Sequence, residues 1–267
     1  MGTRRQSGGG EVTGTQSIER TIEVLKTVAA RKEIGWRLTD LAAHCGLSNA
    51  TTHRIMARLS TERLVQQRSS DRRYVPGPLL YELSLAVPAY TAFQQAVHVD
   101  LVRMARAGDG VAFLCLRSGD EVICVDRAGA SDVQPMTVVG TRRFLLGSTF
   151  GIAILLKLPL PEQQALLASN RRSFRKYNMV RAEAHEKMWR RSLRYGFGLS
   201  RSDVVMGLAG VGVAILDGRG MPFAALGLMG PSAEFDVPRI MKTAALLTEE
   251  AERIGIDQCE LIGDISR

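Results

Sequence analysis

The feature that most constrains the fold is a pair of short helical segments joined by a glycine turn. The first segment is Thr39–Cys45, and the second follows Ser48, whose side chain is suited to cap its first turn. Gly46 lies between them and tolerates the left-handed conformation that a tight interhelical turn requires. Ala42 is small enough to let the two helices approach closely. This spacing is typical of a helix-turn-helix.

Helical periodicity extends the pattern on both sides of the turn. An amphipathic helix is predicted over residues 16–30, because four apolar side chains recur there at helical spacing: Ile18, Ile22, Leu25 and Ala29. The segment after Ser48 runs to about Glu62, and its predicted inward face consists of Thr52, Ile55, Met56 and Leu59. Three helices of this kind form the core of many small DNA-binding domains.

A short hairpin is predicted directly after the third helix. Leu64–Arg68 and Arg72–Pro76 have the character of strands, and the Ser-Ser-Asp sequence between them favours a turn. The hairpin carries basic residues near its tip. A hairpin in this position is a wing, so residues 16–76 are predicted to form a winged helix-turn-helix.

Positive charge is concentrated in the same part of the chain. Residues 1–80 hold 13 Lys and Arg against 7 Asp and Glu, a net of +6, whereas the whole chain of 267 residues has a net of +8. A polyanionic partner is expected to bind where positive charge gathers. We therefore expect residues 16–76 to bind DNA, and residues 1–15 to form a flexible tail.

The remainder of the chain is predicted to be an α+β domain with an antiparallel sheet. Two hairpins are expected, at residues 111–127 and 207–229, because runs of apolar and β-branched residues flank turn sequences there. Helices are expected near residues 93–108, 150–158, 161–168, 182–195 and 240–254. The expected boundaries are a linker helix at 77–90, this domain at 91–258 and a tail at 259–267.

No catalytic, cofactor or metal site is predicted. Gly147–Gly151 has the glycine spacing of a nucleophile elbow, but threonine stands at its centre, and Gly207–Gly212 has the wrong glycine order for a dinucleotide fingerprint. The cysteines and histidines show no metal-ligand spacing, and His185 is predicted to be an exposed helix residue. No run of 18 apolar residues suggests a membrane span. The expectation is a cytoplasmic protein with reduced thiols and no enzymatic activity.

Four N-terminal segments resemble the IclR (isocitrate lyase regulator) family: Gln16–Arg20, Leu38–Ala42, Gly46–Ile55 and Arg73–Gly77. The resemblance extends from about residue 16 to residue 254. It implies a winged helix-turn-helix, a linker helix near the dimer contact, and a C-terminal GAF-like domain with a six-stranded sheet that holds a small effector. It further implies a homodimer or tetramer that binds double-stranded operator DNA as the repressor or activator of a catabolic or metabolic operon.

An alternative is a sensory or protein-interaction module whose DNA-binding half is vestigial. The intact set of basic residues on the third helix and the wing argues against it. A third possibility, an enzyme with a helix-turn-helix appendage, lacks any acid/base pair, nucleophile or metal set in the sequence.

The resemblance also implies which residues contact DNA. In that family the third helix enters the major groove, and the matching positions near its N-terminus are Asn49, Thr51, His53 and Arg54. Arg54 can contact guanine through two hydrogen bonds or can contact a phosphate. Arg58, Arg72 and Arg73 are predicted to contact phosphates, which position the domain without reading the base sequence.

The effector-site motifs of the family are altered in this chain. Matching them residue by residue implies a site lined by Leu146, Gly147, Ser148, Ser200, Gly210, Gly227 and Met229. The three glycines are expected to leave room for a ligand, and two hydroxyls would hold a bare dicarboxylate poorly. The expected effector therefore has a substantial apolar body, such as an aromatic or medium-chain compound. Arg142 and Arg143 either meet a carboxylate at the rim or are solvated, and a decayed site that senses nothing is a further alternative.

Overall fold

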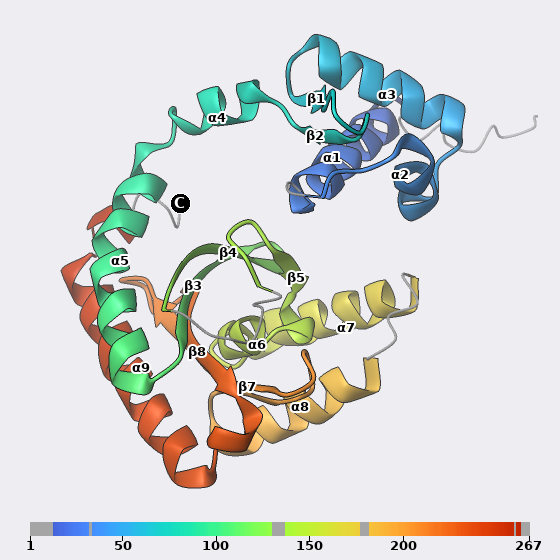
Figure 1. Ribbon diagram of the computed structural model, residues 1–267. Coiled ribbons are helices and arrows are strands. Elements are labelled where there is room, and N and C mark those ends of the chain that lie inside the picture. The colour runs from blue at the N-terminus through green and yellow to red at the C-terminus, as the bar shows by residue number, and fades with distance from the viewer. Residues whose placement is uncertain (1–12, 32–33, 130–136, 177–181, 259, 263–267) are drawn as a thin grey trace, which may run out of the picture. The chain divides into compact units, whose positions relative to one another are not determined.

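The computed structural model describes residues 13–31, 34–129, 137–176, 182–258 and 260–262, and the chain divides into two compact units, Met1–Ala86 and Val87–Arg267 (Figure 1). The predicted tails fall mainly outside the described residues. Two parts of them are nevertheless structured: residues 13–15 belong to the first helix, and Ile262 is fully buried in the core of the second unit. Among the described helices, none combines the length and apolar character needed to span a bilayer.

The first unit is a winged helix-turn-helix. Its elements are α1 (Thr13–Ala30), α2 (Leu38–Cys45), α3 (Asn49–Thr61), β1 (Val65–Gln67), β2 (Tyr74–Pro76) and α4 (Pro78–Ser84). Gly46 ends α2 with a φ of 63°, the left-handed conformation that the sequence predicted. Ser48 caps α3, since its Oγ accepts a hydrogen bond from the backbone N–H of Thr51 at 3.2 Å.

The core of the first unit confirms the predicted inward face of α3. Thr52, Met56 and Leu59 are buried and Ile55 is half-buried. The prediction for α1 is wrong in part: Ile18 and Ile22 are 60% and 48% exposed. The buried face of α1 is instead centred on Val24 and Val28, one turn apart, which pack with Trp36, Leu41, Met56, Leu59 and Val65. Helical spacing alone allowed either stripe.

The second unit contains a longer series of elements. They are α5 (Pro88–Gly108), β3 (Val111–Ser118), β4 (Glu121–Ala128), β5 (Arg142–Phe144), α6 (Thr149–Leu155), α7 (Leu160–Lys176), α8 (Ala182–Tyr195), β6 (Gly198–Arg201), β7 (Leu208–Leu216), β8 (Pro222–Pro231) and α9 (Val237–Asp257). The short strands β5 and β6 were not predicted. Helix α7 extends beyond the predicted residues 161–168. This extension was missed because the C-terminal half of α7 is polar and shows no clear apolar stripe.

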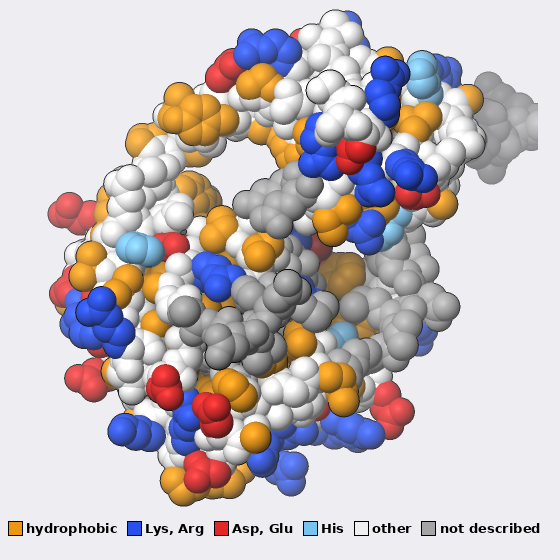
Figure 2. Space-filling model, in the orientation of Figure 1, with side chains coloured by type: hydrophobic (Ala, Val, Ile, Leu, Met, Phe, Trp, Pro, Cys, Tyr) orange, Lys and Arg blue, Asp and Glu red, His pale blue; other side chains and the backbone are white. Residues whose placement is uncertain are grey.

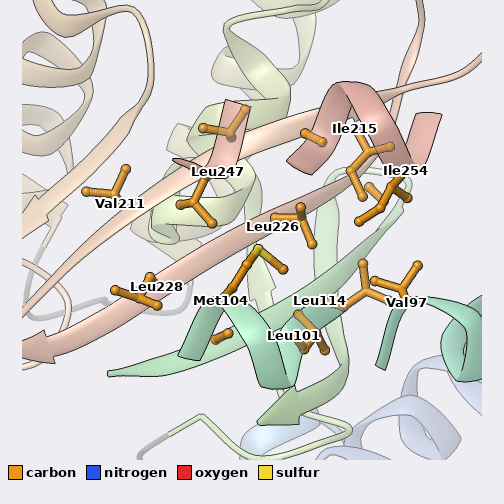
Figure 3. Close-up of a cluster of buried hydrophobic side chains, with 14 of the residues drawn as sticks. Val97, Leu101, Met104, Leu114, Val211, Ile215, Leu226, Leu228, Leu247 and Ile254 are labelled. Atoms are coloured by element: carbon orange, nitrogen blue, oxygen red, sulfur yellow. The ribbon is translucent and has the colours of Figure 1, made fainter. Parts of the chain in front are cut away.

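The described strands of this unit form one antiparallel sheet in the order β5-β4-β3-β8-β7-β6. This confirms the predicted α+β class and the six-stranded sheet. Helices α5 and α9 cover one face of the sheet, and α6 lies on the other with α7 and α8 beyond it (Figure 1). Figure 3 shows the first of these cores, where Leu101 and Met104 of α5 and Leu247 of α9 meet Leu114 of β3 and Leu226 of β8.

Successive side chains of a strand point to opposite faces of the sheet, so they belong to two different hydrophobic clusters. Leu114 and Leu116 of β3 pack toward α5 and α9, whereas Phe113 and Cys115 pack toward α6. In β4, Cys124 also belongs to the cluster on the α6 side. The residues of that second face surround the candidate site described below.

His185 of α8 corrects one prediction. It is 4% exposed, and its ring lies 5.1 Å from the ring of Phe174. The buried face of α8 consists of His185, Met188, Trp189 and Ser192. These residues recur at helical spacing, so His185 belongs to an inward stripe in which a polar residue replaces an expected apolar one.

Candidate functional site

The third helix presents the predicted contact residues to solvent. Asn49, His53 and Arg54 are exposed, and no described residue forms an ion pair with Arg54. Thr51 differs, because its hydroxyl oxygen accepts a hydrogen bond from the Ser48 hydroxyl at 2.9 Å as part of the helix cap. Arg58 is 75% exposed and forms an ion pair with Glu62 one turn later. The face of α3 that contains Arg54 is therefore available to a partner.

The wing is held by an arginine that the sequence analysis did not single out. Arg68 donates two hydrogen bonds to the Asp71 carboxylate, at 3.0 and 2.7 Å, and a third to the carbonyl of Ile34 at 2.9 Å. The hydrogen bond from Arg68 lowers the pKa of Asp71 to about 2, so the pair is ionised at neutral pH. This pair positions the tip of the wing.

The two predicted wing arginines differ in their surroundings. Arg72 is exposed, with a φ of 60° at the tip of the turn. Arg73 is only 29% exposed, and its guanidinium lies 3.5 Å from Asp71 and 3.4 Å from the carbonyl oxygen of Gly35. Of the two, Arg72 is the more accessible cation. Figure 2 shows that further Lys and Arg side chains are exposed on the winged-helix unit.

The second candidate site is a small cavity on the α6 face of the sheet in the C-terminal unit. Its volume is about 20 Å³. Its lining residues come from β3, β4, β5, α6, β8 and the segments beside them: Cys115, Val122, Cys124, Thr137, Thr141, Arg143, Ser148, Thr149, Phe150, Val204 and Met229. Five of these have hydroxyl or guanidinium groups, and four have apolar side chains. The lining of the cavity therefore combines apolar side chains with polar groups.

Two of the seven residues predicted for the effector site line this cavity, Ser148 and Met229. The other five lie outside its lining: Leu146, Gly147, Ser200, Gly210 and Gly227. The backbone N–H of Leu146 donates to Asn170 Oδ1 at 2.9 Å, and its side chain is fully buried in the core. Ser200 is paired with Gly210 in the ladder between β6 and β7. Their contact with an effector stays a prediction.

The expected room beside the glycines is taken by the protein's own side chains. A Cβ atom at Gly227 would overlap the Phe150 ring and lie 2.9 Å from the carbonyl oxygen of Val211. At Gly210 it would lie 2.8 Å from Cγ of Met229. Glycine is present at these positions so that Phe150 and Met229 can pack against the sheet. The prediction that the glycines create ligand space is therefore wrong for these two positions.

A stability measurement tests this packing role. We expect Gly227→Ala to lower the free energy of unfolding by about 1 to 2 kcal/mol, because the new methyl group displaces the Phe150 ring from a filled core. Gly218→Ala is the matched control, since nothing lies within 4 Å of a Cβ atom at that turn position. Urea unfolding of both variants provides the comparison. Equal stability of Gly227→Ala and the wild type would contradict the packing described here.

Arg143 is the charged residue of the cavity. Its side chain is partly buried, its Nε is fully buried, and Nε has no hydrogen-bond partner among the described residues. No described carboxylate forms an ion pair with it. Burial lowers the pKa of Arg143 from its ordinary value, because the charged form loses hydration, yet a guanidinium stays protonated at neutral pH. The cavity therefore holds a cation whose anionic partner is not supplied by the described part of the chain.

Its neighbour Arg142 has a different environment. It donates to Glu121 at 3.0 Å and to the Ser118 hydroxyl at 3.2 Å, and it does not line the cavity. From the sequence, the same two alternatives were open for both arginines, a carboxylate contact or solvation. The strand β5 separates them, because successive side chains of a strand point to opposite faces.

Most of the remaining lining residues were not predicted from the sequence. Thr137, Thr141 and the cysteines Cys115 and Cys124 were not proposed as site residues. Hydroxyl residues scattered over separate elements have no distinctive spacing. The only sequence signal for the two cysteines was the alternation of side chains along the predicted hairpin of β3 and β4. That alternation is compatible with both cysteines lying on the same face of adjacent strands. No group of three or more potential metal ligands is found in the described residues.

Comparison with known proteins gives matches to both halves of the chain. The family model described as the IclR helix-turn-helix domain matches residues 17–69, and the model described as bacterial transcriptional regulator IclR C-terminal matches residues 90–256. Among curated proteins, the acetate operon repressor of Salmonella typhimurium is 24% identical over 250 residues, covering 91% of this chain and 90% of that protein. The glycerol operon regulatory protein of Streptomyces coelicolor is 26% identical, covering 80% and 84%.

Solved structures show the same fold. An IclR family transcriptional regulator from Brucella abortus aligns with a TM-score of 0.71 at 18% identity, covering 91% of this chain and 92% of that one. An IclR homolog from Microbacterium hydrocarbonoxydans, solved in complex with 4-hydroxybenzoate, aligns with a TM-score of 0.66 at 19% identity, covering 91% and 98%.

Proposed function

The chain belongs to the IclR family of bacterial transcriptional regulators, and we propose that it is a homodimer whose affinity for operator DNA is set by a carboxylate effector held at Arg143. As a member of this family it is a DNA-binding, ligand-responsive regulator of transcription. The proposed division assigns DNA binding to residues 16–76, the dimer contact to residues 77–90 and effector binding to residues 91–258. The proposed site of action is the cytoplasm, where operator DNA is found.

Exposed polar and basic residues support the proposed DNA contacts. Asn49, His53 and Arg54 face solvent on α3, which is the helix that enters the major groove in winged helix-turn-helix domains. Arg58 and Arg72 are exposed cations suited to phosphate contact. Thr51 and Arg73 are engaged within the domain, so their proposed part is to hold the cap of α3 and the base of the wing while the domain is bound.

The observation that carries the effector proposal is Arg143, whose buried Nε has no hydrogen-bond partner and whose guanidinium has no ion-pair partner among the described residues. An ion buried without a partner is costly, and a bound anion relieves that cost. The hydroxyls of Thr141, Ser148 and Thr149 add hydrogen-bonding groups to the lining of the same cavity. A carboxylate is the simplest anion that this set recognises.

The apolar wall supports an effector with an apolar body. Val122, Phe150, Val204 and Met229 line the cavity together with its polar groups. The present volume of about 20 Å³ holds about one water molecule, so an aromatic acid has to displace side chains as it binds. Met229 is unbranched and adaptable, and is the proposed moving part. The Microbacterium protein complexed with 4-hydroxybenzoate shows that an IclR homolog takes a ligand of this class.

A ligand panel tests the effector class. Operator affinity is measured by fluorescence anisotropy with duplexes selected from a random pool, with benzoate, 4-hydroxybenzoate, benzamide, pyruvate or glyoxylate added. We expect the aromatic acids to shift operator affinity and the neutral benzamide to have little effect, because only the acids supply a charge for Arg143. A response to pyruvate or glyoxylate alone would contradict the apolar body. A response to benzamide equal to that of benzoate would contradict the role of charge.

Exposed apolar side chains support dimerisation through the linker. Tyr81, Leu83, Leu85 and Val87 are 70%, 55%, 63% and 50% exposed, within seven consecutive residues. Leu79 and Leu80, in the predicted linker helix at residues 77–90, are half-buried. Several large exposed apolar residues in so short a segment are unusual in a monomer and mark an association surface.

Charge substitution on the linker tests the dimer. We expect the double variant Leu83→Glu, Leu85→Glu to be monomeric at micromolar concentration in light scattering, because burying a carboxylate at an apolar interface is unfavourable. Leu160→Glu is the control, since Leu160 is 62% exposed at the start of α7 and lies outside the linker. A wild-type protein that scatters as a monomer would refute the proposal, and so would a double variant that remains a dimer.

A further inference from the structure

Two cysteines face each other across neighbouring strands in the wall of the effector cavity. Cys115 of β3 and Cys124 of β4 are direct register partners, and both are thiols rather than a disulfide. Their side chains are 1% and 2% exposed, and both belong to the hydrophobic cluster on the α6 face. They are therefore adjacent residues on one face of the sheet, not two unrelated buried cysteines.

Backbone hydrogen bonds define the kind of pair that they form. The N–H of Cys124 donates to the carbonyl of Thr141 at 3.0 Å, and its carbonyl accepts from the N–H of Gly140 at 2.7 Å. Both backbone groups of Cys124 are thus turned away from β3. Cys115 and Cys124 form a pair without hydrogen bonds between their backbones, next to a register shift between Leu114 and Cys115. In a regular antiparallel pair of this kind the Cα atoms lie about 4.5 Å apart. That separation falls within the range of about 4.4 to 6.8 Å that a disulfide spans.

The two thiols are chemically unequal. A hydrogen bond from Cys115 lowers the pKa of Cys124 from its ordinary value; burial opposes this effect and the charge of Arg127 adds to it. Burial raises the pKa of Cys115, and its hydrogen bond to Cys124 raises it further. Cys124 is therefore the better nucleophile, and Cys115 is a neighbouring thiol that can react with it in a second step.

The cavity provides the access that buried thiols usually lack. Both sulfur-bearing side chains line it, and its volume of about 20 Å³ accommodates a molecule close to the size of water. Arg143 lines the same space, and its charge acts on Cys115, whereas the charge that favours the Cys124 thiolate is that of Arg127. A small neutral oxidant can therefore reach the pair, whereas bulky reagents cannot.

We propose that Cys115 and Cys124 form a modification site at which a peroxide converts the dithiol into a cross-strand disulfide. In the first step the Cys124 thiolate attacks one peroxide oxygen, the O–O bond breaks, and the leaving oxygen takes a proton to give water or an alcohol. The product is the sulfenic acid of Cys124. In the second step Cys115 sulfur attacks the Cys124 sulfur, the S–S bond forms, and the hydroxyl leaves with the Cys115 proton as water. The two thiols lose two electrons, which reduce the peroxide.

The cysteine pair and the proposed effector share one cavity, so oxidation of the pair should alter effector binding. This consequence rests on the proposed function. The disulfide withdraws two thiols from the wall and joins β3 to β4 beside Arg143. The oxidised protein is then expected to bind benzoate with a changed affinity. Disulfides that form inside cells are commonly transient and redox-sensing, which is consistent with a second input to one regulatory site.

The experiment uses the full chain with Cys45→Ser and Cys259→Ser, so that only the pair remains. The reduced protein is treated with hydrogen peroxide, unfolded in N-ethylmaleimide and weighed by mass spectrometry. We expect a loss of two hydrogen atoms, no maleimide uptake, and recovery of both thiols after dithiothreitol. Maleimide uptake by both cysteines after peroxide would overturn the proposal, and so would oxidation to sulfinic or sulfonic acid without a disulfide.

Single variants in the same background test the order of reaction. With Cys115→Ser, dimedone should trap a sulfenic acid on Cys124. With Cys124→Ser, oxidation of Cys115 should be slower by about tenfold or more, because less thiolate is present. Equal rates would overturn the assignment of Cys124 as the nucleophile. Cys115→Ala and Cys124→Ala repeat the comparison if a serine variant fails to fold. These readouts need neither effector nor DNA, so their failure is separate from a failure of the reduced protein to respond to benzoate.

Discussion

Arg143→Met is expected to abolish the response to aromatic acids. Removing one partner of a buried, hydrogen-bonded charge pair costs about 2 to 5 kcal/mol, which corresponds to about 30-fold to several-thousand-fold in affinity. Methionine keeps the length and apolar stem of the side chain while removing the charge. Benzoate affinity is measured by calorimetry, and operator affinity without ligand is measured alongside it. Operator affinity should be unchanged, because Arg143 belongs to the C-terminal unit.

Two further measurements separate ligand binding from a structural role. Unliganded Arg143→Met should be at least as stable as the wild type, because the substitution removes a buried charge that has no described ionic partner. Arg142→Met is the control, since Arg142 pairs with Glu121 and lies outside the cavity. Its benzoate affinity should stay within about twofold of the wild type. A loss of benzoate binding in Arg142→Met but not in Arg143→Met would contradict the proposed site.

The second large effect is expected at α3. Arg54→Ala should weaken operator binding by about 1 to 3 kcal/mol and relax preference at one base position. Arg54 is exposed and has no ionic partner in the described structure, so its charge is available for a base or phosphate contact. Duplexes that bind the wild type and duplexes that bind Arg54→Ala are each selected from a random pool. Comparing the two sets identifies the base position at which the variant has lost its preference.

Arg72→Ala is the informative comparison for Arg54. A phosphate contact carries no base information, so this wing variant should weaken binding to all duplexes alike and lower the salt slope by about one unit. Arg219→Ala, at the exposed turn between β7 and β8, should leave both quantities unchanged. If Arg54→Ala keeps the wild-type affinity and base preference over a range of salt concentrations, the assignment of Arg54 is wrong.

Much of the first unit could be predicted because its determinants are local. The cap by Ser48, the left-handed Gly46 and the inward face of α3 depend on residues within a few positions of one another. The wing was predicted from a turn sequence between two short strands, but the pair that holds it, Arg68 and Asp71, was not. The choice between the two possible apolar stripes of α1 required the other helices to be in place.

The cavity could not be predicted in the same way, because its walls come from separate strands and helices. From the sequence, Gly210 and Gly227 were predicted to leave room for a ligand. Whether a missing side chain leaves a void depends on what packs opposite, and here Met229 and Phe150 occupy the space. His185 was likewise assigned to solvent from its polarity, although the face of α8 on which it lies is buried.

The sequence by itself determined the winged helix-turn-helix, the α+β class of the second unit and the residues of α3 that face outward, since periodicity, caps and turns encode these within short stretches of chain. The tertiary structure alone decided which charge enters the cavity and which thiols meet. Arg142 and Arg143 are neighbours in sequence but lie on opposite faces of β5, and Cys115 and Cys124 are nine positions apart but adjacent in the sheet. The physical reason is that register and strand alternation, which only pairing establishes, determine the contacts of each side chain.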